Sequence, residues 1–75
     1  MELQDFIKKF SSIFEETAPE TIQADTVFSQ LPEWDSVMML SLITMLDQEY
    51  DIMADVDELN EAVTVQDLFD YVSSL

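Results

Sequence analysis

The sequence lacks cysteine, histidine and glycine altogether, and only two of its 75 residues are basic. Without cysteine the chain can form neither disulfides nor thiolate metal sites, which fits a reducing compartment such as the cytoplasm. Without histidine it cannot build a Ser–His–Asp triad, a Cys–His pair or a histidine metal site. Without glycine, tight hairpins and glycine-rich phosphate-binding loops are disfavoured. We therefore expect a chain that is not an enzyme.

Acidic residues dominate the charge, because 17 acids against two lysines give a net charge of −15. Such a surface repels nucleic acid and anionic lipid and attracts basic partners. Yet 48% of the residues are hydrophobic, too many for a disordered acidic tail. We expect one folded, monomeric domain over residues 1–75. The longest apolar stretch, Val37 to Leu46, is too short to cross a bilayer, and the acidic N-terminus does not resemble a signal peptide.

Helical periodicity is the main structural signal. Residues 3–14 carry apolar side chains at spacings of three and four, which predicts an amphipathic helix. Lys8 and Lys9 are expected on its solvent face, so a Ser–Lys dyad is not expected. Residues 15–33 contain both prolines and no sustained helical period, which predicts a long loop. Five apolar residues could pin that loop to the helices, with a structural role expected for the last of them: Ile22, Val27, Phe28, Leu31 and Trp34.

The last third of the chain predicts two further helices. Residues 51–57 form a connector, and a weak, short helix is expected near residues 57–62. The sequence "TVQD" is a capping box, in which Thr64 begins the final helix and Asp67 lies three residues later. No segment alternates with period two, so no sheet is expected. The fold class is therefore all-α: a small bundle of three main helices plus one short helix, with a long loop between the first and second helices.

The second helix is predicted from Ser36 to Tyr50, with Asp35 as its N-cap. At 100° per residue, one broad apolar arc faces the core. Val37 and Leu40 fall outside that arc, among polar residues and close to Ser36. Two exposed aliphatic side chains beside an exposed serine predict a contact patch. The apolar arc consists of Met38, Met39, Leu42, Ile43, Met45, Leu46 and Tyr50.

A calcium-binding alternative arises from the acids that follow this helix. Their spacing matches positions one, three, five, nine and twelve of an EF-hand loop: Asp47, Glu49, Asp51, Asp55 and Glu58. Two features oppose it. The glycine of the sharp turn is replaced by Ile52, and the first two acids belong by periodicity to the second helix. We therefore expect no specific metal site.

Three motifs resemble the acyl carrier protein family. They are a D-S-aliphatic triplet at the start of the second helix, an acidic helix end with an aromatic residue, and a T-[VI]-x-[DE]-[LVI] start to the last helix. Here they read Asp35-Ser36-Val37, Asp47-Gln48-Glu49-Tyr50-Asp51 and Thr64-Val65-Gln66-Asp67-Leu68. The approach "DTVFSQLPEWDS" is similar to that of stand-alone carriers of the "WDSL" type. The similarity runs from the first amphipathic helix to Tyr71.

The resemblance implies that Ser36 carries 4′-phosphopantetheine, installed from coenzyme A by a phosphopantetheinyl transferase that recognises Asp35. The thiol of the arm then holds an acyl group as a thioester for partner enzymes. These would be acyl ligases, synthases or acyltransferases of fatty-acid-like, polyketide or other dedicated biosynthesis. The second helix is the family's docking element, so apolar and basic partner patches are expected to meet Val37, Leu40, Asp47, Glu49 and Glu58.

The sequence departs from the family pattern in three places. Glu33 replaces a glycine that often lies two residues before the aspartate, while Met38 and Ser41 stand where many carriers have acids. Carriers of fatty-acid synthesis use those acids to meet basic partners, so their loss favours a dedicated pathway with a more apolar interface. The alternative is an unmodified acidic helical protein-interaction domain that has lost its arm. The intact Asp35-Ser36-Val37 triplet argues against that loss.

Overall fold

The computed structural model describes all 75 residues and contains only helices and loops. The helices are α1 (Leu3–Ser12), α2 (Ser36–Tyr50), α3 (Val56–Glu61) and α4 (Val65–Ser73), with short 3-10 helices η1 (Pro19–Thr21) and η2 (Phe28–Gln30) in the long loop. The sole β-type pairing is an isolated bridge between Val27 and Thr64. The predicted all-α architecture is confirmed, with small shifts: α1 ends at Ser12, and α3 begins and ends one residue earlier.

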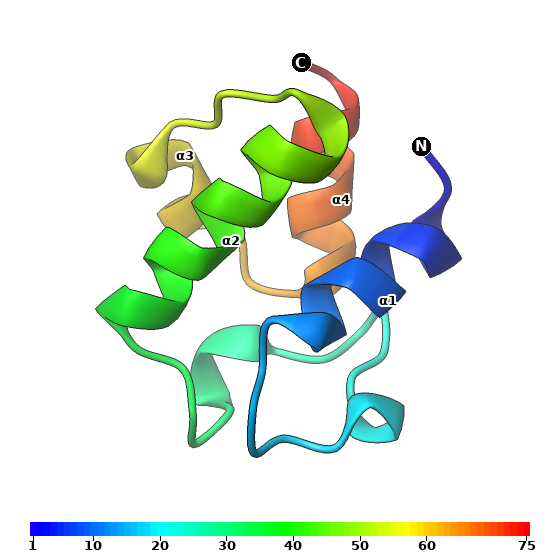
Figure 1. Cartoon of the computed structure of the whole chain (residues 1–75), viewed down its shortest axis with the longest axis vertical. Helices are drawn as coiled ribbons and strands as arrows, with labels where there is room; N and C mark the ends of the chain where they lie inside the picture. Colours follow the sequence, from blue (N-terminus) through cyan, green and yellow to red (C-terminus); the bar gives the residue numbers. More distant parts are fainter.

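The helices pack in one small bundle, in which α1 contacts both α2 and α4, and α3 contacts α4. Figure 1 shows the long loop passing beneath the bundle from α1 to the start of α2. In the same view α2 begins on the side of the molecule that lies away from both termini. The site proposed from the sequence, at the start of α2, therefore lies on a free side of the bundle.

The core takes apolar side chains from every helix and from the loop. On α1 the periodicity predicted the buried face correctly, since Phe6, Ile7 and Phe10 are buried. Burial of these large side chains supplies most of the driving force for a domain this small. The remaining buried apolar residues are Phe14, Ile22, Phe28, Met38, Met39, Leu42, Met45, Leu46, Leu59, Val65, Leu68 and Val72.

The long loop is attached to the bundle through side chains and backbone. Ile22 and Phe28 are buried, which confirms that apolar residues attach the loop to the helices. The half-buried Trp34 packs edge-on against Phe28, with 4.9 Å between ring centroids, and its structural role is confirmed. The loop also pairs with the start of α4, because the Val65 N–H donates to the Thr26 carbonyl at 3.1 Å. The long loop is therefore attached to the bundle at several points before α2 begins.

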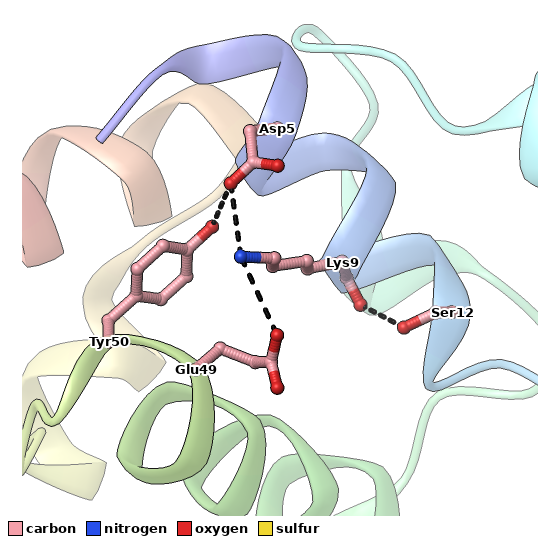
Figure 2. Close-up of polar contacts among 5 residues, drawn as sticks. All are labelled: Asp5, Lys9, Ser12, Glu49 and Tyr50. Atoms are coloured by element: carbon pink, nitrogen blue, oxygen red, sulfur yellow. Dashed lines mark hydrogen bonds and ion pairs between the residues drawn. The ribbon is translucent and has the colours of Figure 1, made fainter.

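The expectation that both lysines lie on a free solvent face was wrong for Lys9. Figure 2 shows its ammonium between helices α1 and α2, at 3.2 Å from Asp5 Oδ2 and 3.5 Å from Glu49 Oε1. The ammonium also lies 4.6 Å from the centre of the Tyr50 ring, whose hydroxyl donates to Asp5 Oδ2 at 3.1 Å. The hydrogen bond to Lys9 lowers the pKa of Asp5 and raises that of Lys9. Periodicity missed this contact because it depends on the packing of α1 against the last turn of α2.

The C-terminal end of α2 is closed without glycine. Asp51 adopts the left-handed conformation, with φ 55° and ψ 43°; its N–H donates to the Asp47 carbonyl, and the Ile52 N–H donates to the Leu46 carbonyl. Aspartate is one of the few non-glycine residues that tolerate this region, because its side chain is short and polar. Together with the Lys9 contacts, this cap fixes the C-terminal end of the helix that begins at the candidate site.

Candidate functional site

Ser36 is the first residue of α2 and is exposed. Asp35 is the predicted N-cap: its Oδ1 accepts a hydrogen bond from the Met38 N–H at 2.9 Å, and its carbonyl accepts from Met39 N–H at 3.1 Å. The first N–H groups of a helix lack intrahelical partners and form the positive end of the helix dipole. A phosphate carried on Ser36 would therefore be favoured by about 0.3–1 kcal/mol at an exposed site.

The residue two positions before Asp35 has a role that the sequence did not reveal. The Glu33 carboxylate accepts hydrogen bonds from the N–H groups of Glu15, Glu16 and Thr17 at 2.8, 3.0 and 3.0 Å, and from the Thr17 hydroxyl at 2.9 Å. The bond from the Glu15 N–H is the largest cause of a lowered pKa of Glu33. The only sequence signal was an acid in the place of a family glycine.

A groove of about 530 Å³ begins at Ser36 and runs between α2 and α3. Its apolar walls come from Met39, Leu40 and Val56, and Trp34 lines it next to the helix start. Asn60 is a polar group on the α3 side. An extended substituent on the Ser36 oxygen could therefore lie against apolar side chains and meet a hydrogen-bonding group.

A second groove of about 550 Å³ lies on the α1 side of α2. It is lined by Val37 and Ser41, and by Lys9 and Ile13 of α1. Leu40 lines both grooves and therefore forms the ridge between them. The predicted exposure is confirmed, since 65% of Val37 and 63% of Leu40 remain exposed.

The surface of α2 near Ser36 carries no charge, because no residue from Ser36 to Leu46 is ionisable as an acid or a base. The acids proposed for docking lie further away. Asp47 is exposed in the last turns of α2, and Glu58 is exposed on α3. Glu49 differs, because it forms the ion pair with Lys9. An uncharged strip next to Ser36 is thus bordered by an acidic surface.

Most acids of the EF-hand-like pattern lie within helices or cap them. Asp47 and Glu49 lie within α2, Asp51 closes it, and the Asp55 side chain accepts hydrogen bonds from the N–H groups of Asp57 and Glu58 as the cap of α3. No group of three acidic side chains in the structure lies close enough together to hold a metal ion.

The comparisons with known proteins decide the family. A model of the phosphopantetheine attachment site matches residues 4–72, nearly the whole chain. The chain belongs to the acyl carrier protein family. A search of curated proteins and a search of solved structures each found no match. None of the helices is both long and apolar enough to span a membrane.

Membership supplies the cofactor and the general activity. Carriers of this family hold covalently bound 4′-phosphopantetheine, and they are carriers rather than catalysts. The chain is therefore a phosphopantetheine-carrying protein that works with a phosphopantetheinyl transferase and with biosynthetic enzymes. The residues at the start of α2 fit the group, because an exposed hydroxyl lies at a helix N-terminus and opens on an apolar groove.

Proposed function

We propose that Ser36 is the attachment residue and that the carrier delivers acyl thioesters to enzymes of a dedicated biosynthetic pathway. The observation that carries this proposal is the exposed Ser36 hydroxyl at the first position of α2, next to a capping Asp35 and at the mouth of a groove. The attached group supplies a thiol that forms the thioester. The chain itself contributes position, since no histidine or cysteine is present to do chemistry.

Loading requires a base from the transferase. The Ser36 oxygen bonds to the phosphorus next to pantetheine while the pyrophosphate bond of coenzyme A breaks, so that adenosine 3′,5′-bisphosphate leaves. The hydroxyl proton passes to a group on the transferase, because this chain offers no histidine. Asp35 is exposed and uses one carboxylate oxygen as the helix cap. Its other oxygen is available to the transferase, which supports the proposed role in recognition.

The groove between α2 and α3 would hold part of the arm or its acyl group. Leu40 and Val56 offer apolar contact, and the Asn60 amide offers a hydrogen bond to the amides of the arm. The exposed fractions of Leu40 and Val56, 63% and 44%, leave surface for such contact. Burial of apolar surface gains about 25 cal/mol per Å², so even partial shielding of an acyl chain is favourable.

Partner enzymes would dock on the uncharged strip of α2. Val37 and Leu40 present apolar surface, and the acids Asp47 and Glu58 surround it with negative charge. Glu49 shares the Lys9 ammonium with Asp5, which partly screens its charge, so it is the weakest of the proposed docking acids. We propose partners, such as acyl ligases, synthases or acyltransferases, that combine an apolar contact with a few peripheral bases. The absence of cysteine supports a cytoplasmic pathway.

The test is a loading reaction followed by intact-mass measurement. The wild-type chain is incubated with coenzyme A and a broad-specificity transferase, and we expect a gain of one phosphopantetheine. Ser36→Ala should show no gain. Ser41→Ala is the matched control, because Ser41 lies on the same helix about one and a half turns later, and it should load. Loading of Ser36→Ala would show that another residue carries the phosphopantetheine. If several transferases fail to load the wild type, an unmodified interaction domain is favoured.

A further inference from the structure

The Glu33 carboxylate is bound by consecutive backbone N–H groups, as an anion is bound in a protein nest. Oε2 accepts from Glu15, and Oε1 accepts from Glu16 and from both the backbone and the hydroxyl of Thr17. No base takes part in these contacts. The anion bound by the N–H groups of residues 15–17 is therefore a side chain of the protein itself.

Those three N–H groups have no partner from α1. The helix ends at Ser12, and the N–H groups of Ile13 and Phe14 donate back to the carbonyls of Phe10 and Ser11. Residues 15–17 come next, and Glu33 is the acceptor that satisfies them. Hydrogen bonds to an ionised acceptor are shorter and stronger than those between neutral groups. The contact therefore holds the two ends of the long loop together.

The segment between Glu33 and Ser36 is held at each residue. The Trp34 N–H donates to the Leu31 carbonyl at 2.9 Å, and its ring lies against Phe28. Asp35 is fixed by its bond to the Met38 N–H. Two links in this series reach back toward α1: the Trp34 ring lies 6.1 Å from the Phe10 ring of α1, and the Glu33 carboxylate accepts its hydrogen bonds from residues 15–17, across 16 to 18 residues of sequence. The carboxylate is the polar link of the two.

We infer that Glu33 is a positioning residue for the modification of Ser36: its carboxylate clamps the segment before α2 to the end of α1 and thereby fixes the backbone on which a transferase meets the serine hydroxyl. This inference rests on the proposed function of Ser36. It explains why Glu33 stands two residues before Asp35, where the family often has glycine. The hydrogen bonds of the carboxylate hold the backbone at this position, whereas glycine would leave it conformationally free. The bond from the Glu15 N–H is the largest cause of the lowered pKa of Glu33, so the clamp favours the ionised carboxylate that it needs.

Glutamine at position 33 breaks the clamp with the smallest change of shape. A side-chain amide has one accepting oxygen and one donating NH2 group. If the amide oxygen faces Glu16 and Thr17, the NH2 group faces the Glu15 N–H, and two donors oppose each other. The reverse orientation loses the three bonds to Oε1. Neither orientation satisfies all four donors.

Loosening this segment should change the two kinetic constants of loading differently. When only a fraction of the carrier presents Ser36 correctly, the apparent affinity for the transferase falls by that fraction. We expect Glu33→Gln to raise KM for the carrier about 3- to 10-fold, with kcat nearly unchanged. Thr17→Val removes only the hydroxyl bond to Glu33 and should produce a smaller shift in the same direction.

The experiment compares these variants with Glu20→Gln, an exposed loop residue whose loss changes charge equally but removes no contact of the clamp. Loading kinetics are measured by intact mass, and amide hydrogen exchange is followed at residues 15–17. Faster exchange at 15–17 together with raised KM in Glu33→Gln, but not in Glu20→Gln, supports the inference. Helix content by circular dichroism shows that all variants are folded.

Three outcomes would overturn it. Faster exchange with wild-type KM would mean that the clamp exists but does not position Ser36. Unchanged exchange at residues 15–17 in Glu33→Gln would mean that the clamp does not form in solution. If the wild-type chain gains no mass, the assignment of Ser36 fails and the positioning role falls with it, although slow exchange at 15–17 would still show the clamp.

Discussion

Leu40 offers the sharpest separation of function from folding. It lies on the outer face of α2, one turn after Ser36, with 63% of its surface exposed. Leu40→Asp removes the ridge between the two grooves and places a carboxylate in the uncharged strip. Since the side chain contributes little to the core, the free energy of unfolding should change by less than about 1 kcal/mol.

The expected loss of partner affinity follows from the exposed area. Complete burial of a leucine side chain contributes about 1.5–3 kcal/mol, and the 63% that remains exposed can give a partner about 1–2 kcal/mol of this. At 1.4 kcal/mol per tenfold, that is a loss of about 5- to 27-fold in kcat/KM. Burial of an unpaired carboxylate adds to the loss.

The assay measures loading by a phosphopantetheinyl transferase and acyl transfer to each available partner at low carrier concentration. Met53→Asp is the control, because Met53 is 93% exposed in the connector after α2 and the substitution adds the same charge. We expect the control to load and transfer at the wild-type rate. Wild-type turnover of Leu40→Asp with the transferase and with every partner would refute docking on this strip.

Two further predictions concern the helix ends. Asp51→Gly should raise the free energy of unfolding by about 1 kcal/mol. The backbone of Asp51 has the left-handed conformation, which glycine adopts more easily, and its carboxylate lies at the negative end of the helix dipole. Thermal melting should show a rise of about 4–8 °C, and a fall would mean that the Asp51 side chain makes a stabilising contact. Asp67 accepts from Val63 and Thr64, and the Thr64 N–H is the main cause of its lowered pKa. A lowered folded pKa gives stability that is present above the ordinary value of 3.8 and is lost as pH falls through the folded value. Urea unfolding of wild type and Asp67→Asn should therefore converge in acid, and parallel pH profiles would contradict this reading.

The parts of the fold that the sequence predicted are those encoded by neighbours in the chain. The bounds of α2 follow from the Asp35 cap and from apolar spacing, and both are local signals. The capping box at Thr64 is likewise complete within four residues, and the structure forms both of its hydrogen bonds. The exposure of Val37 and Leu40 followed from the same helical period that buried their neighbours.

The contacts that the sequence did not predict join distant segments. Lys9 meets Glu49 only because α1 packs against the last turn of α2. Glu33 meets Thr17 only because the long loop returns to the end of α1. In a chain with 17 acids, no local pattern distinguishes Glu33 and Glu49, which make these long-range contacts, from the acids that make none. Charge composition therefore predicted the character of the surface but not which acids hold the fold together.

These long-range contacts help to fix α2 at both of its ends. Its start is fixed through Glu33 and Asp35, and its end through Lys9 and Asp51, while Leu42 and Leu46 anchor its inner face in the core. The outer face near Ser36 is used by none of these interactions. Because the exposed face of α2 makes no contact that holds the fold, its side chains can be substituted without loss of protein stability. Of the two positions where many carriers have acids, Met38 is buried in the core and only the half-buried Ser41 borders that face. We therefore expect recognition to depend more on the shape of Val37 and Leu40 than on charge.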